Sequence, residues 1–248
     1  LDKEHSYNIF KINNGRIYTD TVTDTAFIIE NKIIKEPSFQ HRNPKNADIL
    51  SNIVFQKGTP KYKKNLKGKV FSLLTGGGGN ANYWHWLFDV LPRINILENK
   101  VNLENIDYFL FPDLKEKFQF ETLNHLNIPV DKRLSSRVFR HVQTVEAIAV
   151  DHPYVMKNDP SIEIQNLPHW ILKYLRNKFL NKKNSKNFPD KFYIDRSDSK
   201  SNHRHLRKII NEIEVKELLA QKGFSVVTLS NLSFIDQVNL FQNASHIV

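Results

Sequence analysis

One segment limits the fold of this chain more than any other. A short apolar run at residues 70–74 is followed by glycines 76–79 and then by a helical pattern that reaches Arg93. A buried strand, a glycine turn and a helix in this order are typical of a parallel α/β sheet. The turn also gathers backbone N–H groups at a helix N-terminus, which suits an anionic group. Gly78 and Gly79 are therefore candidate substrate-binding residues.

The glycine run has other interpretations. It satisfies G-x-G-x-x-A, the dinucleotide-binding pattern, but four consecutive glycines meet that pattern trivially. No acidic residue follows a second strand at the expected distance of about 20 residues, so a dehydrogenase is the weakest hypothesis. No Lys-Ser or Lys-Thr follows the glycines, which excludes a P-loop. The plain alternative is a flexible turn that allows close backbone approach.

Strand-like and helical segments alternate on both sides of residues 152–168, a polar stretch that holds three prolines. This pattern predicts two α/β domains, 1–160 and 161–248, joined near residues 152–182, with a linker helix at 169–180. Residues 7–35 alternate apolar and polar positions and predict a small antiparallel start, with a hairpin turn at Asn13-Asn14-Gly15. A helix at 211–222 is expected to carry a capping box of Asn211 and Glu214 and to end at Gly223.

Composition excludes several classes of site. The chain has no cysteine, so disulfides, thiolate metal sites and a cysteine nucleophile are excluded. We expect a reducing compartment, most simply bacterial cytoplasm. The net charge of +10 is concentrated at residues 61–69 and 173–191. Such runs form either solvated surfaces or a basic patch that binds an anionic membrane surface, such as the inner face of the membrane. Nucleic acid is the weakest candidate, because aromatic residues do not interleave with these lysines.

A first group of candidate catalytic residues lies on the helix after the glycines. His85, Asp89 and Arg93 are spaced four apart and share one helix face, while Trp84, Leu87, Phe88 and Leu91 are expected on the core side. A carboxylate one turn from a histidine can hold the imidazole in one tautomer as a general base. Alternatively, Asp89 is itself the base, or His85 merely packs while Asp89 pairs with Arg93 on a solvated face.

Asn82 and Tyr83, at the start of this helix, join Arg93 as candidate substrate-binding residues.

A second group follows a predicted strand at residues 192–194. Its candidate nucleotide-binding residues are Arg196, Ser197, Arg204, Arg207, Asn211 and Glu212. Arginine offers a planar fork that matches phosphate oxygens, so several such groups at a strand end and helix start would neutralise a diphosphate. The alternative is a solvated basic loop. Asp195 and Asp198 alternate with the cations, which indicates an organised pairing network.

The chain lacks the common metal motifs. Neither Asp-x-Asp nor a His-x-x-x-His or His-Glu-x-x-His zinc signature occurs, so we predict no catalytic metal and no bound cofactor. The charge of a leaving group would then have to be met by arginine, lysine and helix dipoles.

Together, the two groups resemble family 61 glycosyltransferases. Residues 82–93, NYWHWLFDVLPR, are similar to the N-terminal signature of that family. A second set of residues is similar to its C-terminal signature: Ile194-Asp195-Arg196-Ser197-Asp198 with Arg207, Ile210, Asn211 and Glu212. Leu232-Ser233-Phe234, Gln237 and Ala244 continue the resemblance, which spans residues 70–248. The family's next landmark, a Gly-x-His-Gly-Ala loop, is expected just after Val248, so we expect a truncated C-terminal domain.

The resemblance implies a GT-B-like fold, in which two Rossmann-like domains face a cleft. It also implies inverting, metal-independent transfer from a nucleotide sugar, UDP-linked, to a glycan or lipid-linked glycan acceptor, as in bacterial capsule synthesis. The N-terminal domain would hold the acceptor and the C-terminal domain the nucleotide. The stretch between Arg196 and Asn211 is longer than the family's usual one, so either Arg204 or Arg207 takes the place of the family arginine. The competing hypothesis is a non-catalytic binder of nucleotide sugars or other anionic ligands.

Overall fold

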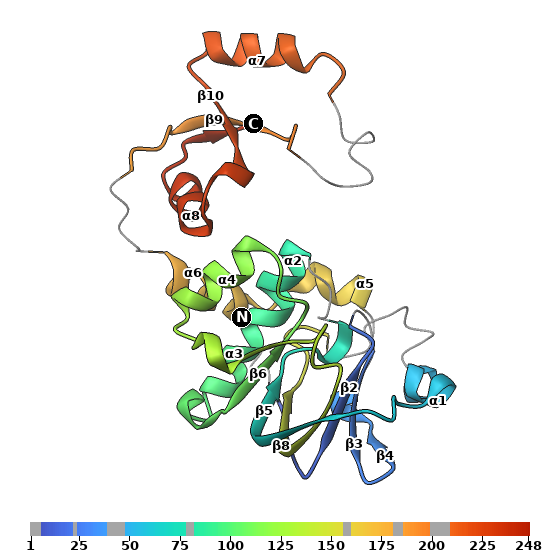
Figure 1. Cartoon of the computed structure of the whole chain (residues 1–248). Coiled ribbons are helices and arrows are strands. Elements are labelled where there is room, and N and C mark those ends of the chain that lie inside the picture. The colour runs from blue at the N-terminus through green and yellow to red at the C-terminus, as the bar shows by residue number, and fades with distance from the viewer. Residues whose placement is uncertain are drawn as a thin grey trace. The chain divides into compact units, whose positions relative to one another are not determined.

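The computed structural model describes residues 6–21, 24–38, 48–77, 82–155, 160–180, 186–198 and 209–248. The chain divides into two compact units, Leu1–Leu175 and Arg176–Val248, each with its own sheet (Figure 1). This division lies within the predicted junction at residues 152–182, and none of the described strands belongs to both sheets. The predicted boundary at residue 160 falls inside the first unit, and the predicted linker helix begins in that unit. Which unit binds which substrate stays a prediction.

The first unit is built on an eight-stranded mixed sheet. Its order is β4-β3-β2-β8-β5-β6-β7, and β1 also pairs with β8. The strands β5 to β8 pair in parallel, whereas β1 to β4 pair antiparallel. The bounds are β1 (Ile9–Asn13), β2 (Arg16–Thr19), β3 (Thr25–Ile29), β4 (Lys32–Ile34), β5 (Lys64–Ser72), β6 (Tyr108–Phe111), β7 (Arg133–Ser135) and β8 (His141–Val150). The predicted antiparallel start and mainly parallel centre are confirmed.

The predicted hairpin turn at Asn13-Asn14-Gly15 is wrong. β1 and β2 run in the same direction along β8, with Asn13 opposite Glu146 and Arg16 opposite Gln143 in one unbroken register. The pair of residues between them is a local irregularity, in which the Asn14 N–H donates to the carbonyl of Val145 at 2.8 Å. A Cβ at Gly15 would lie 3.0 Å from the Cβ of Ala147, so the glycine permits close approach to β8.

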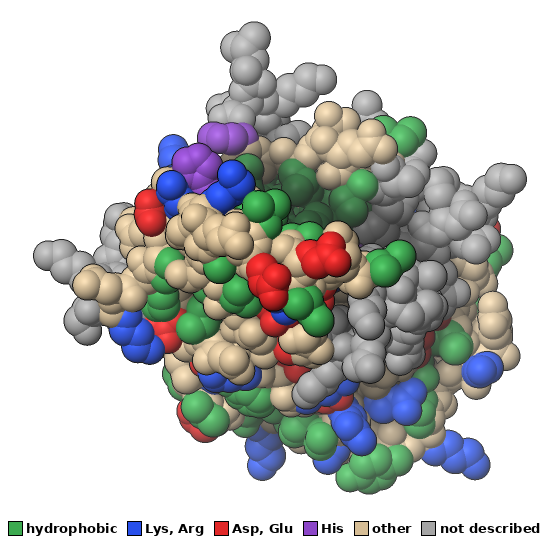
Figure 2. All heavy atoms as spheres, turned by 90° about the horizontal axis from the view of Figure 1, so that it is seen from above, with side chains coloured by type: hydrophobic (Ala, Val, Ile, Leu, Met, Phe, Trp, Pro, Cys, Tyr) green, Lys and Arg blue, Asp and Glu red, His purple; other side chains and the backbone are tan. Residues whose placement is uncertain are grey.

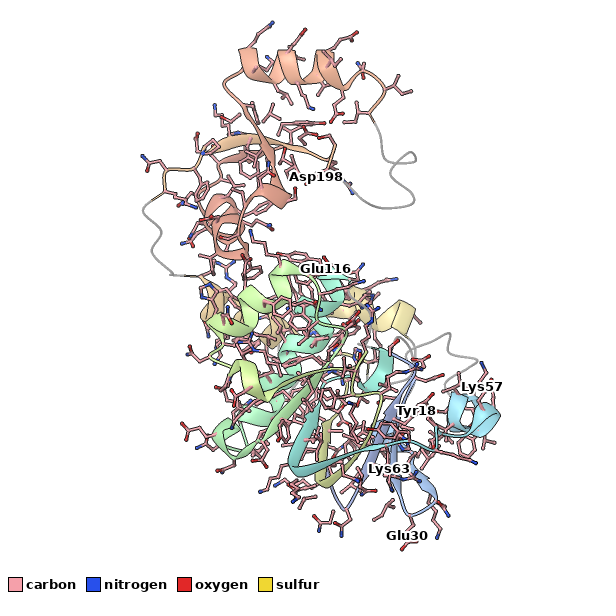
Figure 3. All side chains as sticks on the ribbon, viewed as in Figure 1. Tyr18, Glu30, Lys57, Lys63, Glu116 and Asp198 are labelled. Carbon is pink, nitrogen blue, oxygen red and sulfur yellow. The ribbon has the colours of Figure 1, made fainter. Side chains whose placement is uncertain are left out.

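The helices of the first unit follow its strands. They are α1 (Ile53–Lys57), α2 (Tyr83–His85), α3 (Leu91–Glu98), α4 (Lys117–His125), α5 (Pro160–Glu163) and α6 (His169–Phe179), with a π-helical turn at Trp86–Val90 between α2 and α3. The last turn of α6 belongs to the second unit, which begins at Arg176. The helix α4 begins at a capping box of Glu116, labelled in Figure 3, and Gln119. None of the helices in the described residues is long and apolar enough to cross a membrane.

The polar stretch at residues 152–168, expected near the junction of the two domains, begins inside the core of the first unit. Residues 152–155 are buried. The Nδ1 atom of His152 accepts the N–H groups of Tyr154 and Val155 at 3.3 and 3.1 Å, and both of these side chains pack against Ile171 of α6. The local cap and the two apolar side chains explain why this stretch folds onto the unit that precedes it.

The second unit is a smaller α/β layer. Its parallel sheet has the order β10-β9-β11, with β9 (Lys191–Asp195), β10 (Ser225–Thr228) and β11 (His246–Ile247), and its helices are α7 (Glu212–Gln221) and α8 (Phe234–Gln242). Gly223 has φ +79°, as a glycine helix stop requires, and the Ser233 side chain caps α8. The predicted capping box of α7 is wrong, because the Asn211 side chain makes no capping bond and instead donates to Glu214 at 3.3 Å.

Charges of both signs are mixed on the face of the molecule shown in Figure 2, where Lys and Arg side chains lie among Asp, Glu and hydrophobic groups. In the basic run at residues 61–69, the side chains of Lys67 and Lys69 are exposed along β5. Lys63 donates to Gln143 at 3.3 Å, and Lys64 lies over the ring of Phe139 at 5.1 Å. The run therefore combines solvated cations with packed ones.

Candidate active site

The end of β5 leads into a tight turn, as the sequence predicts. Residues Thr75–Gly77 form a 3₁₀ turn in which Gly76 has φ +73°, a left-handed conformation that favours glycine. Gly78 and Gly79, which we expect to bind substrate, lie outside the described residues. Phosphate binding at the glycine run therefore stays a prediction.

Asn82 and Tyr83 open the helix after the glycines. The side-chain oxygen of Asn82 accepts the backbone N–H groups of Trp84 and His85 at 2.8 and 3.3 Å, so Asn82 is the helix N-cap. Tyr83 is 40% exposed and packs edge-on against Phe118 of α4, with ring centroids 4.8 Å apart. Burial and the carboxylate of Glu121 raise the pKa of Tyr83 to about 12, so its hydroxyl stays protonated.

The helix that carries the candidate catalytic residues is not a single α-helix. Between α2 and α3, the N–H of Leu91 donates to the carbonyl of Trp86, five residues back, which defines a π turn. Pro92 explains this turn. Proline has no N–H, and its ring would clash with the carbonyl of Phe88 four residues earlier in a regular α-helix. The wider turn changes the direction of every side chain that follows it.

His85 and Asp89 are in contact across this turn. The Nδ1 atom of His85 lies 2.5 Å from Oδ2 of Asp89. The side chain of His85 is 31% exposed, and that of Asp89 only 1%. The geometry assigns the proton of this bond to Nδ1, since an ionised carboxylate only accepts. The lone pair of the imidazole then lies on Nε2, where a general base needs it.

The predicted outward face of this helix is only partly correct. Asp89 and Arg93 are fully buried, so the face that begins at His85 turns into the core rather than lying open. Arg93 donates through Nε to the carbonyl of Asp89 at 2.7 Å and through Nη2 to the carbonyl of Thr75. It is therefore enclosed by protein, which differs from the expected substrate contact. The π turn accounts for the difference, because it displaces residues after Val90 from regular α-helical positions.

The expected core side also needs correction. Leu91 is buried, but Trp84, Leu87 and Phe88 are only half-buried. Trp86, by contrast, is fully buried, and its Nε1–H donates to Oγ1 of Thr122 in α4 at 2.8 Å. Trp84 stacks on Phe88 with ring centroids 4.9 Å apart. The helix is thus clamped on two sides, by α4 through Trp86 and by the buried residues 154–155 and α6 through Trp84.

Two residues near the His85–Asp89 pair are not indicated by the sequence pattern around the helix. Tyr154 is buried, and its hydroxyl lies close enough to Asp89 and Arg93 to be affected by both. Burial first, and then the Asp89 carboxylate, raise the pKa of Tyr154. Asp151 follows β8, and burial raises its pKa although Asn8 donates two hydrogen bonds to it, at 2.7 and 2.9 Å. The apolar run at residues 147–150, which Asp151 directly follows, is the only signal that could have found it.

In the second unit, the candidate nucleotide-binding residues follow β9. Arg196 and Ser197 are exposed, and Asn211 is exposed at the start of α7. Arg204 and Arg207 lie outside the described residues, so their contribution stays a prediction. Parallel strands direct their carboxyl ends to one edge, where α/β sheets bind ligands.

The expected pairing network at this edge is present in part. The carboxylate of Asp195 accepts the N–H of Ser197 at 2.8 Å and pairs with Lys216 at 3.0 Å, and the Ser197 bond is the main cause of its lowered pKa. Asp198, labelled in Figure 3, accepts the N–H of Ser230 at 3.3 Å and so links the loops after β9 and β10. Glu212 accepts the hydroxyl proton of Tyr193 at 2.9 Å, so this predicted nucleotide ligand already has a partner in the protein.

Within the described residues, no group of three or more His, Asp or Glu side chains is placed to hold a metal ion.

Comparison with known proteins identifies the family to which the chain belongs. A model of the family described as Glycosyltransferase 61 matches residues 83–248, a range that begins at the helix of His85 and includes the whole second unit. No curated protein matches the chain significantly. Because the family model spans well over half of the sequence, the chain belongs to the glycosyltransferase 61 family and is a glycosyltransferase.

Proposed function

We propose that this glycosyltransferase is an inverting enzyme that moves a sugar from a nucleotide sugar to a glycan acceptor without a metal ion. The observation that carries the proposal is the close pair of His85 and Asp89 on the helix that follows β5. Of the two residues, His85 is the base, because its ring is partly exposed whereas the carboxylate of Asp89 is enclosed. Asp89 orients the imidazole and stabilises its charged form.

The reaction follows from this assignment. A hydroxyl oxygen of the acceptor attacks the anomeric carbon while Nε2 of His85 takes the hydroxyl proton. The bond between the anomeric carbon and the phosphate oxygen breaks, and the nucleoside diphosphate leaves with the electron pair. A single displacement of this kind inverts the anomeric configuration. Its rate depends on a base on the acceptor side and on charge stabilisation on the leaving side.

We assign the leaving side to the second unit. Arg196, Arg204 and Arg207 would meet the diphosphate charge, together with the backbone at Ser197 and Asn211. Support comes from the exposed position of Arg196 just past β9 and from the link between the β9 and β10 loops through Asp198. Calorimetry with UDP should show binding that survives EDTA. Binding that disappears in EDTA would contradict the metal-free proposal.

On the acceptor side, we propose that Tyr83 contacts the acceptor, because its ring is partly exposed and lies two residues before His85. Gly78, Gly79 and Asn82 stay candidates for the same role. The acceptor is proposed to be a glycan or lipid-linked glycan of a bacterial surface polysaccharide, handled in the cytoplasm or at the inner face of the membrane. The exposed lysines of β5 support contact with an anionic lipid surface.

The deciding experiment is a panel of nucleotide sugars assayed with the purified protein in EDTA. We expect one donor to be consumed with formation of an inverted product, read by NMR of the anomeric proton. His85→Ala should lower this turnover by about 10²–10⁴-fold while UDP binding persists. Donor binding by a folded wild-type protein without any turnover or donor hydrolysis would favour a non-catalytic binder. Product with retained configuration would refute the single displacement.

A further inference from the structure

Arg93 is one of the largest fully buried side chains of the protein and carries a charge into the core. Burial lowers the pKa of Arg93 to about 10, a value that still leaves the guanidinium protonated at neutral pH. Three neighbours oppose this shift: Asp89 on its own helix, Tyr154, and Asp151 after β8. A buried cation of this kind is costly unless a nearby anion and hydrogen bonds compensate it. Asp89 supplies the anion one turn away.

The hydrogen bonds of Arg93 tie together two parts of the proposed site. Nε donates to the carbonyl of Asp89 at 2.7 Å, inside the π turn caused by Pro92, and Nη2 donates to the carbonyl of Thr75. Thr75 opens the turn that contains the first glycines. One planar side chain thus fixes the backbone of the base-orienting residue relative to the end of β5.

We propose that Arg93 is a positioning residue, whose guanidinium holds the π turn against the glycine turn and offsets the charge of Asp89, thereby setting the orientation and basicity of His85. The carboxylate of Asp89 contacts the imidazole of His85 directly, and the charge of the guanidinium of Arg93 acts on the same carboxylate from nearby. Without Arg93, the uncompensated carboxylate would draw a proton onto the His85–Asp89 pair more strongly. The imidazole would then be protonated, and inactive as a base, over more of the neutral pH range.

This proposal rests on His85 being the base, but it can be tested without any measurement of turnover. NMR follows the titration of the His85 imidazole, whose signal is identified by its absence in His85→Gln. In Arg93→Gln, we expect the pKa of the pair to rise by roughly one unit, as for removal of one nearby charge at a protein-like dielectric. In Arg93→Lys, the charge is kept and the pKa should stay within about 0.3 unit of wild type.

Arg133 offers a matched control. Its guanidinium donates to the carbonyl of Ile128 and to the side-chain oxygen of Asn124, and burial lowers its pKa as well. Arg133→Gln should leave the His85 titration unchanged. If the pKa of His85 in folded Arg93→Gln were equal to or lower than the wild-type value, the proposal would be overturned.

Arg93→Lys carries the test on its own if Arg93→Gln does not fold. Lysine cannot span both carbonyls with a planar fork, so the base should be misplaced and kcat should fall roughly 10–100-fold at unchanged donor KM. Wild-type kcat in folded Arg93→Lys would refute the positioning role. If His85→Ala keeps its turnover, the proposed function fails, whereas the NMR result on Arg93 still stands or falls separately.

Discussion

Replacing Asp89 with asparagine tests the proposed base most directly. The substitution keeps the size of the side chain but removes the charge that faces Nδ1 of His85 at 2.5 Å. A charge-assisted hydrogen bond is worth about 1.5–3 kcal/mol, and about 1.4 kcal/mol changes a rate tenfold. Loss of this bond alone therefore slows turnover about 10–100-fold if its energy acts in the transition state.

A second effect adds to the first. The amide of asparagine can donate to Nδ1, which would place the imidazole proton on Nε2 and remove the lone pair that takes the acceptor proton. Loss of general-base catalysis typically costs about 10²–10⁴ in rate. We therefore expect kcat of Asp89→Asn to fall by about 10²–10⁴, with little change in donor affinity.

The assay is initial-rate kinetics with the donor that the panel identifies, alongside circular dichroism to confirm folding. His85→Ala should be similarly slow, and the double variant should be little worse than either single variant, because the pair acts as one unit. Asp236→Asn removes a carboxylate that pairs with Lys186 at 2.6 Å in the second unit and serves as the control for loss of an ion pair. If folded Asp89→Asn kept kcat within about tenfold of wild type, the assignment of the base would be refuted.

Three further predictions concern stability. Trp86→Phe should lower the free energy of unfolding by about 2–3 kcal/mol in urea titrations, because a fully buried indole and its bond to Thr122 are lost; an unchanged midpoint would contradict the clamp on α4. Asn82→Ala removes the N-cap of α2 and should cost about 1 kcal/mol in the same assay, whereas Asn82→Asp should restore most of it. Burial holds the pKa of His141 below its ordinary 6.5, so the unfolded chain binds this proton first and stability should fall as pH drops below 6.5. His141→Gln should weaken that fall between about pH 7 and 5.5, and an identical slope in the variant would show that His141 does not cause it.

The sequence predicts the elements of the fold better than their connections. The strand predicted at residues 192–194 lies within β9, because continuous apolar runs between turns need no long-range information. The register of β1 and β2 was missed, because Asn-Gly is the usual hairpin signal and only contact with β8 shows that the chain continues straight. A local pattern cannot report a partner that lies over a hundred residues away.

The candidate site shows the same limit. The contact of His85 with Asp89 follows from helical spacing. The burial of Arg93 does not, because the π turn at Pro92 breaks the spacing on which the outward face was predicted. Tyr154 and Asp151 reach this neighbourhood from a distant part of the chain, so no pattern around the helix could have named them.

The place of β8 in the sheet has a consequence for synthesis of the chain. β8 is the last strand of the first unit in sequence, yet it lies between β2 and β5, and its Val150 pairs with Ile9. The early strand β1 therefore lacks its partner, and β2 has only β3 beside it, until residues 141–150 have left the ribosome. Such non-local pairing slows folding and leaves strand edges open meanwhile. Newly made chains should thus depend on chaperones until β8 closes the sheet.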